Sequence, residues 1–276
     1  MHFHNTPITF LILSYLTFLS FHLLIKCEPT GTYTIKSKIL RPKTSQHCYT
    51  QGLFFSDTGG TLFESCGLYS TSSFRKYTYP SLSLLKQIIL PRNYFGEGIA
   101  KCGSFIYQLT WREQQILQYQ SETLQLTSYI KLPLKEGWGM SQYNTNELLL
   151  TDGSDKIYFA KCENDNTITI YNNITVTFPN TNTTVNKLND LIYAKKHIWA
   201  NRYFDNKIYK INPSNGKVIT TYTMDKLIEH ETQQKTLTQS KLNSGYVLNG
   251  IAYHKQQDVF LITGKEWGYY YEIQFN

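Results

Sequence analysis

The chain has 276 residues, which is enough for one large domain, or two modest ones, with a substantial hydrophobic core. Aromatic residues are frequent, with 22 tyrosines among them, and β-branched residues are abundant. This composition favours β-strands. The net charge of +7 comes from scattered Lys and Arg residues, whose longest run is Lys195–Lys196. Nucleic-acid binding requires a clustered basic stripe, so we expect a solvated basic surface and no nucleic-acid partner.

Residues 8–25 (ITFLILSYLTFLSFHLLI) form an uncharged apolar run that Lys26 closes. The length suits either a signal peptide or a marginal membrane anchor, and both stay open because no clear cleavage site follows. We therefore expect residues 1–31 to be a leader with a short linker. The chain should enter the secretory pathway, with the remaining domain secreted or anchored on the lumenal or extracellular side.

Four cysteines follow the leader, at Cys48, Cys66, Cys102 and Cys162. In an oxidising compartment they are expected to form disulfides, with three possible pairings. Neither they nor the dispersed histidines show the spacing of metal ligands, so we expect no metal site and no cofactor. Asn173 (NIT) and Asn182 (NTT) are glycosylation sequons. The alternative is a chance match in a segment rich in Asn and Thr.

An extended run at residues 32–40 precedes five copies of one pattern. Each copy begins with a polar or aromatic residue before Gly or Asp, followed by an apolar alternation, a polar turn and a second apolar run. The copies begin at Gln51, Glu97, Trp138, Asn189 and Asn249. This pattern predicts a hairpin in each copy, and two further strand-like runs follow, as in residues 207–224. The copies start roughly 40 to 60 residues apart, which is typical of propeller blades.

The fifth copy is short, because the chain ends at Asn276 after its third strand-like run. The run at residues 32–40 can supply the missing strand and close the ring, which removes open sheet edges. We therefore predict that residues 32–276 form a single all-β, five-bladed β-propeller closed by an N-terminal strand in the last blade. A polar insertion with helical character occupies residues 225–245. The alternative fold is an antiparallel barrel or a pair of sandwiches.

The first strand of every propeller blade lines the central channel, so the five starting residues are expected to meet at one mouth. The second strands return to the same mouth and end near Trp111, Asp152, Tyr203 and Lys265. Apolar walls with a few convergent polar groups are typical of a small-ligand site. Turn capping or packing between blades could explain each residue alone. The residue type differs from blade to blade, however, and this favours a binding site.

Eight motifs at these positions resemble one protein family. In chain order they are YTQGL (49–53), YFGEGI (94–99), QLTW (108–111), EGWGM (136–140), LNDLIY (188–193), IWANRY (198–203), LNGIAY (248–253) and TGKEW (263–267). Together, over roughly residues 33–276, they resemble the β-propeller class of glutaminyl cyclases, the glutaminyl-peptide cyclotransferases. The zinc-dependent glutaminyl cyclases have a different, α/β fold, and the dispersed histidines fit the propeller class.

The resemblance implies an acyltransferase that converts the N-terminal glutamine of peptides or proteins to pyroglutamate and releases ammonia. Glu97 matches the catalytic glutamate of the family, and Lys265 and Asn189 match polar pocket residues that we also assign to catalysis. The expected substrate-binding residues are Gln51, Phe95, Trp111, Trp138, Tyr203 and Asn249. Two positions depart from the family pattern: Asp190 stands where the family has Glu, and Tyr203 stands where it has Trp.

The implied chemistry needs a proton shuttle, for which Glu97 is the candidate, and donors for a developing oxyanion, for which Lys265, Asn189 and Gln51 are candidates. We expect a monomer whose partners are its peptide substrates. Two alternatives belong to other functional classes. One is a non-catalytic propeller that binds peptides or glycans at the channel mouth, and the other is an extracellular or membrane-tethered scaffold that would tolerate loss of the mouth residues.

Overall fold

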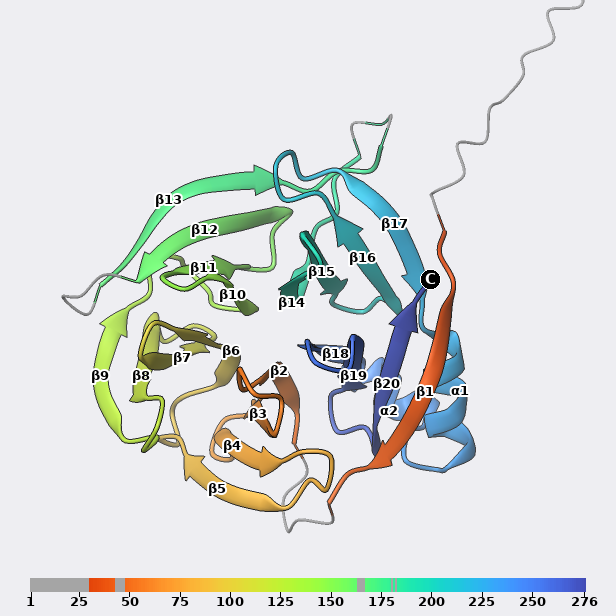
Figure 1. Ribbon diagram of the computed structural model, residues 1–276, viewed down its shortest axis with the longest axis horizontal. Helices are drawn as coiled ribbons and strands as arrows, with labels where there is room; N and C mark the ends of the chain where they lie inside the picture. The colour runs from red at the N-terminus through yellow and green to blue at the C-terminus, as the bar shows by residue number, and fades with distance from the viewer. Residues whose placement is uncertain (1–29, 43–47, 163–166, 180, 182) are drawn as a thin grey trace, which may run out of the picture.

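The computed structural model describes residues 30–42, 48–162, 167–179, 181 and 183–276. The predicted leader and the sequon residue Asn182 lie outside the described residues. Within them, twenty strands form five four-stranded antiparallel sheets around a central axis (Figure 1). This is the five-bladed β-propeller that the repeated pattern predicts.

Four blades are continuous in sequence, and each runs from the channel outward in chain order. The first contains β2 (Thr50–Phe55), β3 (Thr61–Cys66), β4 (Ser73–Thr78) and β5 (Leu84–Ile89). The second contains β6 (Gly96–Cys102), β7 (Phe105–Thr110), β8 (Gln115–Gln120) and β9 (Leu126–Lys131). The third contains β10 (Met140–Asn144), β11 (Glu147–Leu150), β12 (Lys156–Cys162) and β13 (Ile168–Thr175). The fourth contains β14 (Leu188–Ala194), β15 (His197–Arg202), β16 (Lys207–Ile211) and β17 (Val218–Thr223).

The fifth blade combines the two ends of the described chain. Its strands are β18 (Leu248–His254), β19 (Val259–Gly264), β20 (Tyr269–Phe275) and the N-terminal β1 (Tyr33–Leu40). β1 pairs antiparallel with β20, so that Leu40 faces Tyr269 and Tyr33 faces Phe275. Figure 1 shows β1 as the outermost strand of this blade. The strand that the short fifth copy lacks is therefore supplied by the start of the domain.

The hydrophobic core lies between neighbouring blades, where the apolar faces of two sheets meet. Between the first and fifth blades, for example, Leu62 and Tyr77 pack in one cluster with Leu261 and Tyr270, and all four are almost completely buried. Such burial of large apolar side chains is the main stabilising term of the fold. An inner strand such as β18 is consequently buried along nearly its whole length, whereas an outer strand such as β5 faces solvent.

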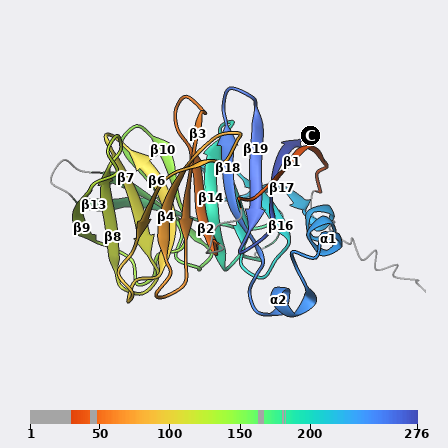
Figure 2. The same cartoon turned by 90° about the horizontal axis from the view of Figure 1, so that it is seen from below.

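The insertion at residues 225–245 forms two short helices, as its composition predicts. They are α1 (Asp225–Gln233) and α2 (Gln239–Asn243), and they connect β17 with β18. Figure 2 shows α1 at the rim of the ring and α2 projecting from one face. Leu227 and Glu231 of α1 are buried against the fifth blade, where Glu231 accepts the backbone N–H groups of Gly268 and Tyr269. In the described part of the chain, every helix is too short or too polar to cross a membrane.

The cysteines form two disulfides, and this resolves the pairing that the sequence leaves open. Cys48–Cys66 links the entry to β2 with the end of β3 inside the first blade. Cys102–Cys162 links the ends of β6 and β12, and so it ties the second blade to the third.

A mostly buried arginine joins the first blade to the last at the point of closure. Arg41, directly after β1, donates from Nη1 to Glu64 Oε1 at 2.9 Å and from Nη2 to Thr50 Oγ1 at 2.6 Å and Thr263 Oγ1 at 3.1 Å. Its guanidinium lies 4.1 Å from the ring centroid of Tyr270, whose hydroxyl donates to Glu64 Oε2 at 2.8 Å. One cation thereby holds strands of both blades together.

Replacing Arg41 by Met should lower the free energy of unfolding by about 3–5 kcal/mol, because Glu64 would stay buried without its cation. Urea denaturation of the full chain measures this. Lys195→Met is the matched control: it breaks the exposed Lys195–Asp258 pair and should cost about 1 kcal/mol or less. Equal losses in the two variants would contradict a closing role for Arg41.

Candidate functional site

β-Bulges interrupt the inner strands at four of the five predicted mouth positions. The register between the first two strands of a blade shifts between Thr50 and Gly52, between Gly96 and Ile99, between Leu188 and Leu191, and between Leu248 and Ile251. The residues inside these shifts are Gln51, Glu97, Asn189 and Asn249. A bulge redirects a side chain away from the alternation of the strand. The repeated special residues are thus turned out of the sheets.

Two glycines let the inner strands touch at this mouth. A Cβ atom on Gly98 would lie 2.4 Å from the backbone nitrogen of Met140, and one on Gly139 would lie 2.0 Å from the carbonyl oxygen of Asn189. Gly98 also donates its N–H to the carbonyl of Trp138 at 2.7 Å. Any side chain here would separate the blades. The glycines therefore bring Glu97, Trp138 and Asn189 close together.

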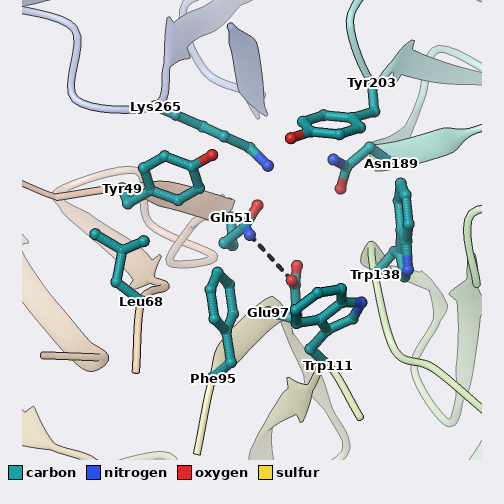
Figure 3. Close-up of a pocket in the computed structure, with 10 residues that line it drawn as sticks. All are labelled: Tyr49, Gln51, Leu68, Phe95, Glu97, Trp111, Trp138, Asn189, Tyr203 and Lys265. Atoms are coloured by element: carbon teal, nitrogen blue, oxygen red, sulfur yellow. Dashed lines mark hydrogen bonds between the residues drawn. The ribbon is translucent and has the colours of Figure 1, made fainter. Parts of the chain in front are cut away.

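The mouth residues line a pocket of about 200 Å³. Its walls are formed by Tyr49, Gln51, Leu68, Phe95, Glu97, Trp111, Trp138, Asn189, Tyr203 and Lys265 (Figure 3). Eight of the nine site residues expected from the sequence are in this set. Asp152, which the repeat pattern also places near the mouth, does not line the pocket. Its carboxylate accepts hydrogen bonds from Ser154 and Tyr158.

Asn249 is the expected site residue that the structure does not bring to the pocket wall. It is fully buried, and its Nδ2 donates to Gln51 Oε1 at 3.2 Å and to the Thr50 carbonyl at 2.9 Å. Its Oδ1 accepts from Asn201 Nδ2 at 3.0 Å. These contacts use both hydrogens of the Asn249 amide, so Asn249 supports Gln51, and its contact with substrate stays a prediction.

Glu97 lies in the floor of the pocket and is only 5% exposed. Its Oε1 accepts from Gln51 Nε2 at 3.0 Å, so the chain of amides from Asn201 through Asn249 and Gln51 ends on this carboxyl group. Burial raises the pKa of Glu97 well above its ordinary value, although the nearby Lys265 opposes the shift. A carboxyl group with a raised pKa can hold or release a proton near neutral pH.

Lys265 enters the pocket from the opposite side and is also almost completely buried. Its Nζ lies 4.9 Å from the ring centroid of Tyr49 and 4.6 Å from that of Tyr203, within the range of cation–π contacts. Burial lowers the pKa of Lys265 to about 8, against the raising effect of Glu97 and Asp190. The site therefore contains one cationic donor that faces the buried acid across the cavity.

Asn189 and Asp190 occupy the bulge of β14. The Asn189 side chain points into the pocket (Figure 3), while its backbone carbonyl accepts from Thr151 Oγ1 at 2.7 Å. Asp190 points away from the pocket lining and accepts the backbone N–H of Ile251 at 2.8 Å, which couples the fourth blade to the fifth. Burial raises the pKa of Asp190 well above its ordinary value. The Asp that replaces the family's Glu thus serves as a link between blades.

Sequence and structural comparisons agree with this geometry. Residues 16–275 match the sequence model of the family described as glutamine cyclotransferase. The chain belongs to the glutamine cyclotransferase family. It is similar to the glutaminyl-peptide cyclotransferase of Arabidopsis thaliana, with 29% identity over 236 residues that cover 82% of this chain and 67% of the relative. It also resembles the crystal structure of Myxococcus xanthus glutaminyl cyclase, with a TM-score of 0.77 and 25% identity over 90% of this chain and 98% of that one.

Two pocket residues are not among those expected from the sequence. Tyr49 precedes β2, and its hydroxyl donates to the carbonyl of Gly245 at 2.9 Å, while Leu68 follows β3. Leu68 has a φ of 86°, which is unusual for a branched residue. Tyr49 stands inside the motif YTQGL and could have been considered. No sequence pattern marks Leu68, because the conformation of its loop brings it to the pocket.

One carboxylate holds the aromatic wall of the pocket. Trp111 and Trp138 donate their indole N–H groups to Glu136 Oε2, at 2.8 and 3.0 Å, and Arg112 donates to Glu136 Oε1 at 3.0 Å. Partial burial raises the pKa of Glu136, but these three donors outweigh it and lower the pKa below its ordinary value. Phe95 packs edge-on against Trp111 at 5.5 Å between centroids. The wall is therefore rigid before any ligand arrives.

Among the residues that the structure describes, one group has the composition and spacing of a metal site. It consists of Cys48, Glu64 and Cys66. The two cysteines form a disulfide, and Glu64 pairs with Arg41. These residues do not line the pocket, and a disulfide sulfur is not the thiolate that a metal site requires.

Proposed function

We propose that the chain converts the N-terminal glutamine of peptides or proteins to pyroglutamate with release of ammonia. The observation that carries the proposal is the pocket itself. In a member of the glutamine cyclotransferase family, a buried acid, a buried lysine and an amide face one another inside an aromatic wall. This arrangement supplies each element that the cyclisation needs.

The aromatic wall addresses the conformational part of the barrier. The α-amine must reach the γ-carbonyl of its own side chain, so the glutamine has to fold back on itself. Phe95, Trp111 and Trp138 bound a cavity of about 200 Å³ that a folded glutamine side chain can fill, displacing water from the reacting groups. Orientation of the reacting groups can lower an activation free energy by roughly 7–11 kcal/mol in the best cases. Holding the glutamine in its near-attack shape can provide several kcal/mol of that reduction.

Glu97 moves the proton. The neutral α-amine nitrogen attacks the γ-carbonyl carbon, a C–N bond forms, and the carbonyl electrons move to oxygen. Glu97 accepts a proton from the attacking nitrogen and returns it to the amide nitrogen. The electron pair on oxygen then re-forms the carbonyl, the bond from the γ-carbon to that nitrogen breaks, and ammonia leaves the lactam. Because its pKa is raised by burial, Glu97 is suited to both transfers.

Lys265 and Asn189 stabilise the oxygen on which negative charge develops. Gln51 keeps only one N–H group for this, because its Nε2 donates the other to Glu97 and its Oε1 accepts from Asn249. Lys265 Nζ is held between the rings of Tyr49 and Tyr203, and the Asn189 side chain points into the same cavity. Fixed donors in a site sheltered from water are strong oxyanion stabilisers. We therefore assign the oxyanion to Lys265 and Asn189, and Gln51 to holding Glu97.

The contribution of Lys265 should fall as the pH rises through about 8, the pKa to which burial lowers it. Below that pH the amine is cationic, and above it the amine is neutral and the weaker donor. Ionisation of the substrate α-amine affects every variant alike, so it cancels in a ratio. The ratio of kcat for the wild type to kcat for Lys265→Met should therefore decrease from pH 7 to pH 9. A constant ratio would contradict a cationic role for Lys265.

We further propose that the domain works in an oxidising compartment outside the cytoplasm, without a bound metal. Two disulfides support the compartment. Asn173, the sequon residue on the outer strand β13, is exposed and accessible for glycosylation. The metal-independent mechanism is supported by the pocket lining, in which Glu97 can carry the proton and Lys265 and Asn189 can donate to the oxyanion.

The test of the proposed function is turnover of matched peptides by the purified chain. A Gln-initiated peptide should form pyroglutamate, whereas an Asn-initiated peptide of otherwise equal sequence should not, because its shorter side chain cannot close the five-membered lactam. Mass spectrometry of both peptides provides the readout. Binding of the Gln-initiated peptide without conversion would instead favour a non-catalytic peptide-binding propeller.

A further inference from the structure

A second cavity of about 260 Å³ lies beside the glutamine pocket. The loop between β15 and β16 contributes Phe204, Asp205 and Asn206, and the insertion contributes Ile228 from α1 and Leu242 from α2. Val247, at the entry to β18, completes the apolar lining. The insertion therefore builds one wall of this cavity.

The two cavities share a wall. Phe204 packs against Tyr203 with 4.5 Å between ring centroids, and Tyr203 lines the glutamine pocket. Val247 lines the second cavity, and its carbonyl accepts the backbone N–H of Lys265 at 2.9 Å. Because neighbouring residues of one loop line each cavity, a chain that leaves the glutamine pocket past Tyr203 reaches the second cavity at once.

Phe204 is an exposed aromatic in an unfavourable backbone conformation. It is 51% exposed, and its φ is 59°, in the left-handed region that bulky residues rarely adopt. Glycine or asparagine would fit this position better. An aromatic side chain is thus kept at the rim of the pocket, where it is not needed for the core.

We propose that this second cavity binds an apolar side chain from one of the two residues that follow the N-terminal glutamine of the substrate. The inference rests on the proposed function. Consecutive residues of an extended chain lie about 3.8 Å apart, so one or two residues span the Tyr203–Phe204 wall. The cavity lining is mostly apolar, and Asp205, the charged residue in that lining, is paired with Arg202. An acidic side chain in the cavity would lose its hydration without gaining a free cation. The site should therefore prefer leucine or phenylalanine to aspartate.

The test measures kcat/KM for glutaminamide and for four peptides that carry Leu or Asp at the second or the third position. The wild type should favour Leu over Asp by about tenfold at one of the two positions, the usual range for one apolar pocket. Phe204→Gly should abolish most of this preference while thermal stability is kept, because glycine adopts the same φ without strain. Leu242→Gln, on the opposite wall, should have the same effect. Tyr171→Ala, an exposed aromatic on β13, should leave the preference unchanged.

Equal kcat/KM for Leu and Asp peptides in the wild type would overturn the inference, and so would a preference that survives both Phe204→Gly and Leu242→Gln. Failure to convert even glutaminamide would count against the proposed function instead. In that case the Kd values of the same peptides, measured by calorimetry, show whether the cavity binds an apolar side chain. The Leu peptide should still bind about tenfold more tightly in the wild type, and equal Kd values would reject the cavity as a binding site.

Discussion

Replacing Glu97 by Gln should lower kcat for a Gln-initiated peptide by about a thousandfold, within the range expected for loss of a general acid–base. The Gln side chain keeps an oxygen that can accept the hydrogen bond from Gln51 Nε2, but it cannot take up and return a proton. KM should change little, because shape and hydrogen bonding are preserved. Ammonia release at saturating peptide measures the effect, and Glu122→Gln on the exposed turn after β8 is the matched control.

The same variant should be at least as stable as the wild type. Burial raises the pKa of Glu97 above its value in the unfolded chain, so the native state binds the proton more tightly. Stability from this group is therefore lost as the pH rises above the unfolded pKa of about 4.3. Gln does not ionise and removes that loss at neutral pH. A thermal melt shows whether a loss of turnover comes from unfolding or from the missing proton shuttle. A folded variant with wild-type turnover would contradict the proton-shuttle role.

Replacing Lys265 by Met should lower kcat by about a hundredfold to a thousandfold, the typical effect of removing one oxyanion donor. Met keeps an apolar side chain of similar reach between Tyr49 and Tyr203, so the pocket should not collapse. The charge on the carbonyl oxygen grows only toward the transition state. The loss should therefore fall on kcat more than on KM.

Steady-state kinetics of Lys265→Met beside Lys131→Met, an exposed lysine on β9, measure this division. If KM rises while kcat stays at the wild-type value, Lys265 positions the substrate and another group stabilises the oxyanion. Asn189→Ala would then be the next variant to examine, because Asn189 is the second donor that points into the pocket.

The fold follows from the sequence because each blade is a local unit. Strand alternation, turns and the repeat spacing are all short-range signals. The pairing of residues 33–40 with the last strand was expected from the short fifth copy alone. The disulfide pairing could not be predicted, because it depends on how the sheets are placed in space. Cys102–Cys162, for example, connects two blades across 60 residues.

The candidate site is predictable where it coincides with the repeat. Gln51, Glu97 and Asn189 stand at equivalent strand starts, and the bulges there turn their side chains into the pocket. Asn249 also stands at a strand start, but it does not line the pocket, and its side chain donates a hydrogen bond to Gln51. Sequence reasoning could not separate these cases, because the depth of a side chain depends on packing between blades. Leu68 could not be predicted because it lies in a loop, outside the repeated strand positions.

The central claim is that this pocket cyclises an N-terminal glutamine through its own free α-amine. The most direct measurement follows pyroglutamate and ammonia from a Gln-initiated peptide and from its N-acetylated twin, with the same purified wild-type chain. We predict one ammonia for each pyroglutamate with the free peptide, and no reaction with the acetylated one. A correctly folded chain that leaves the free peptide unchanged, or that deamidates both peptides equally, would contradict the proposed function.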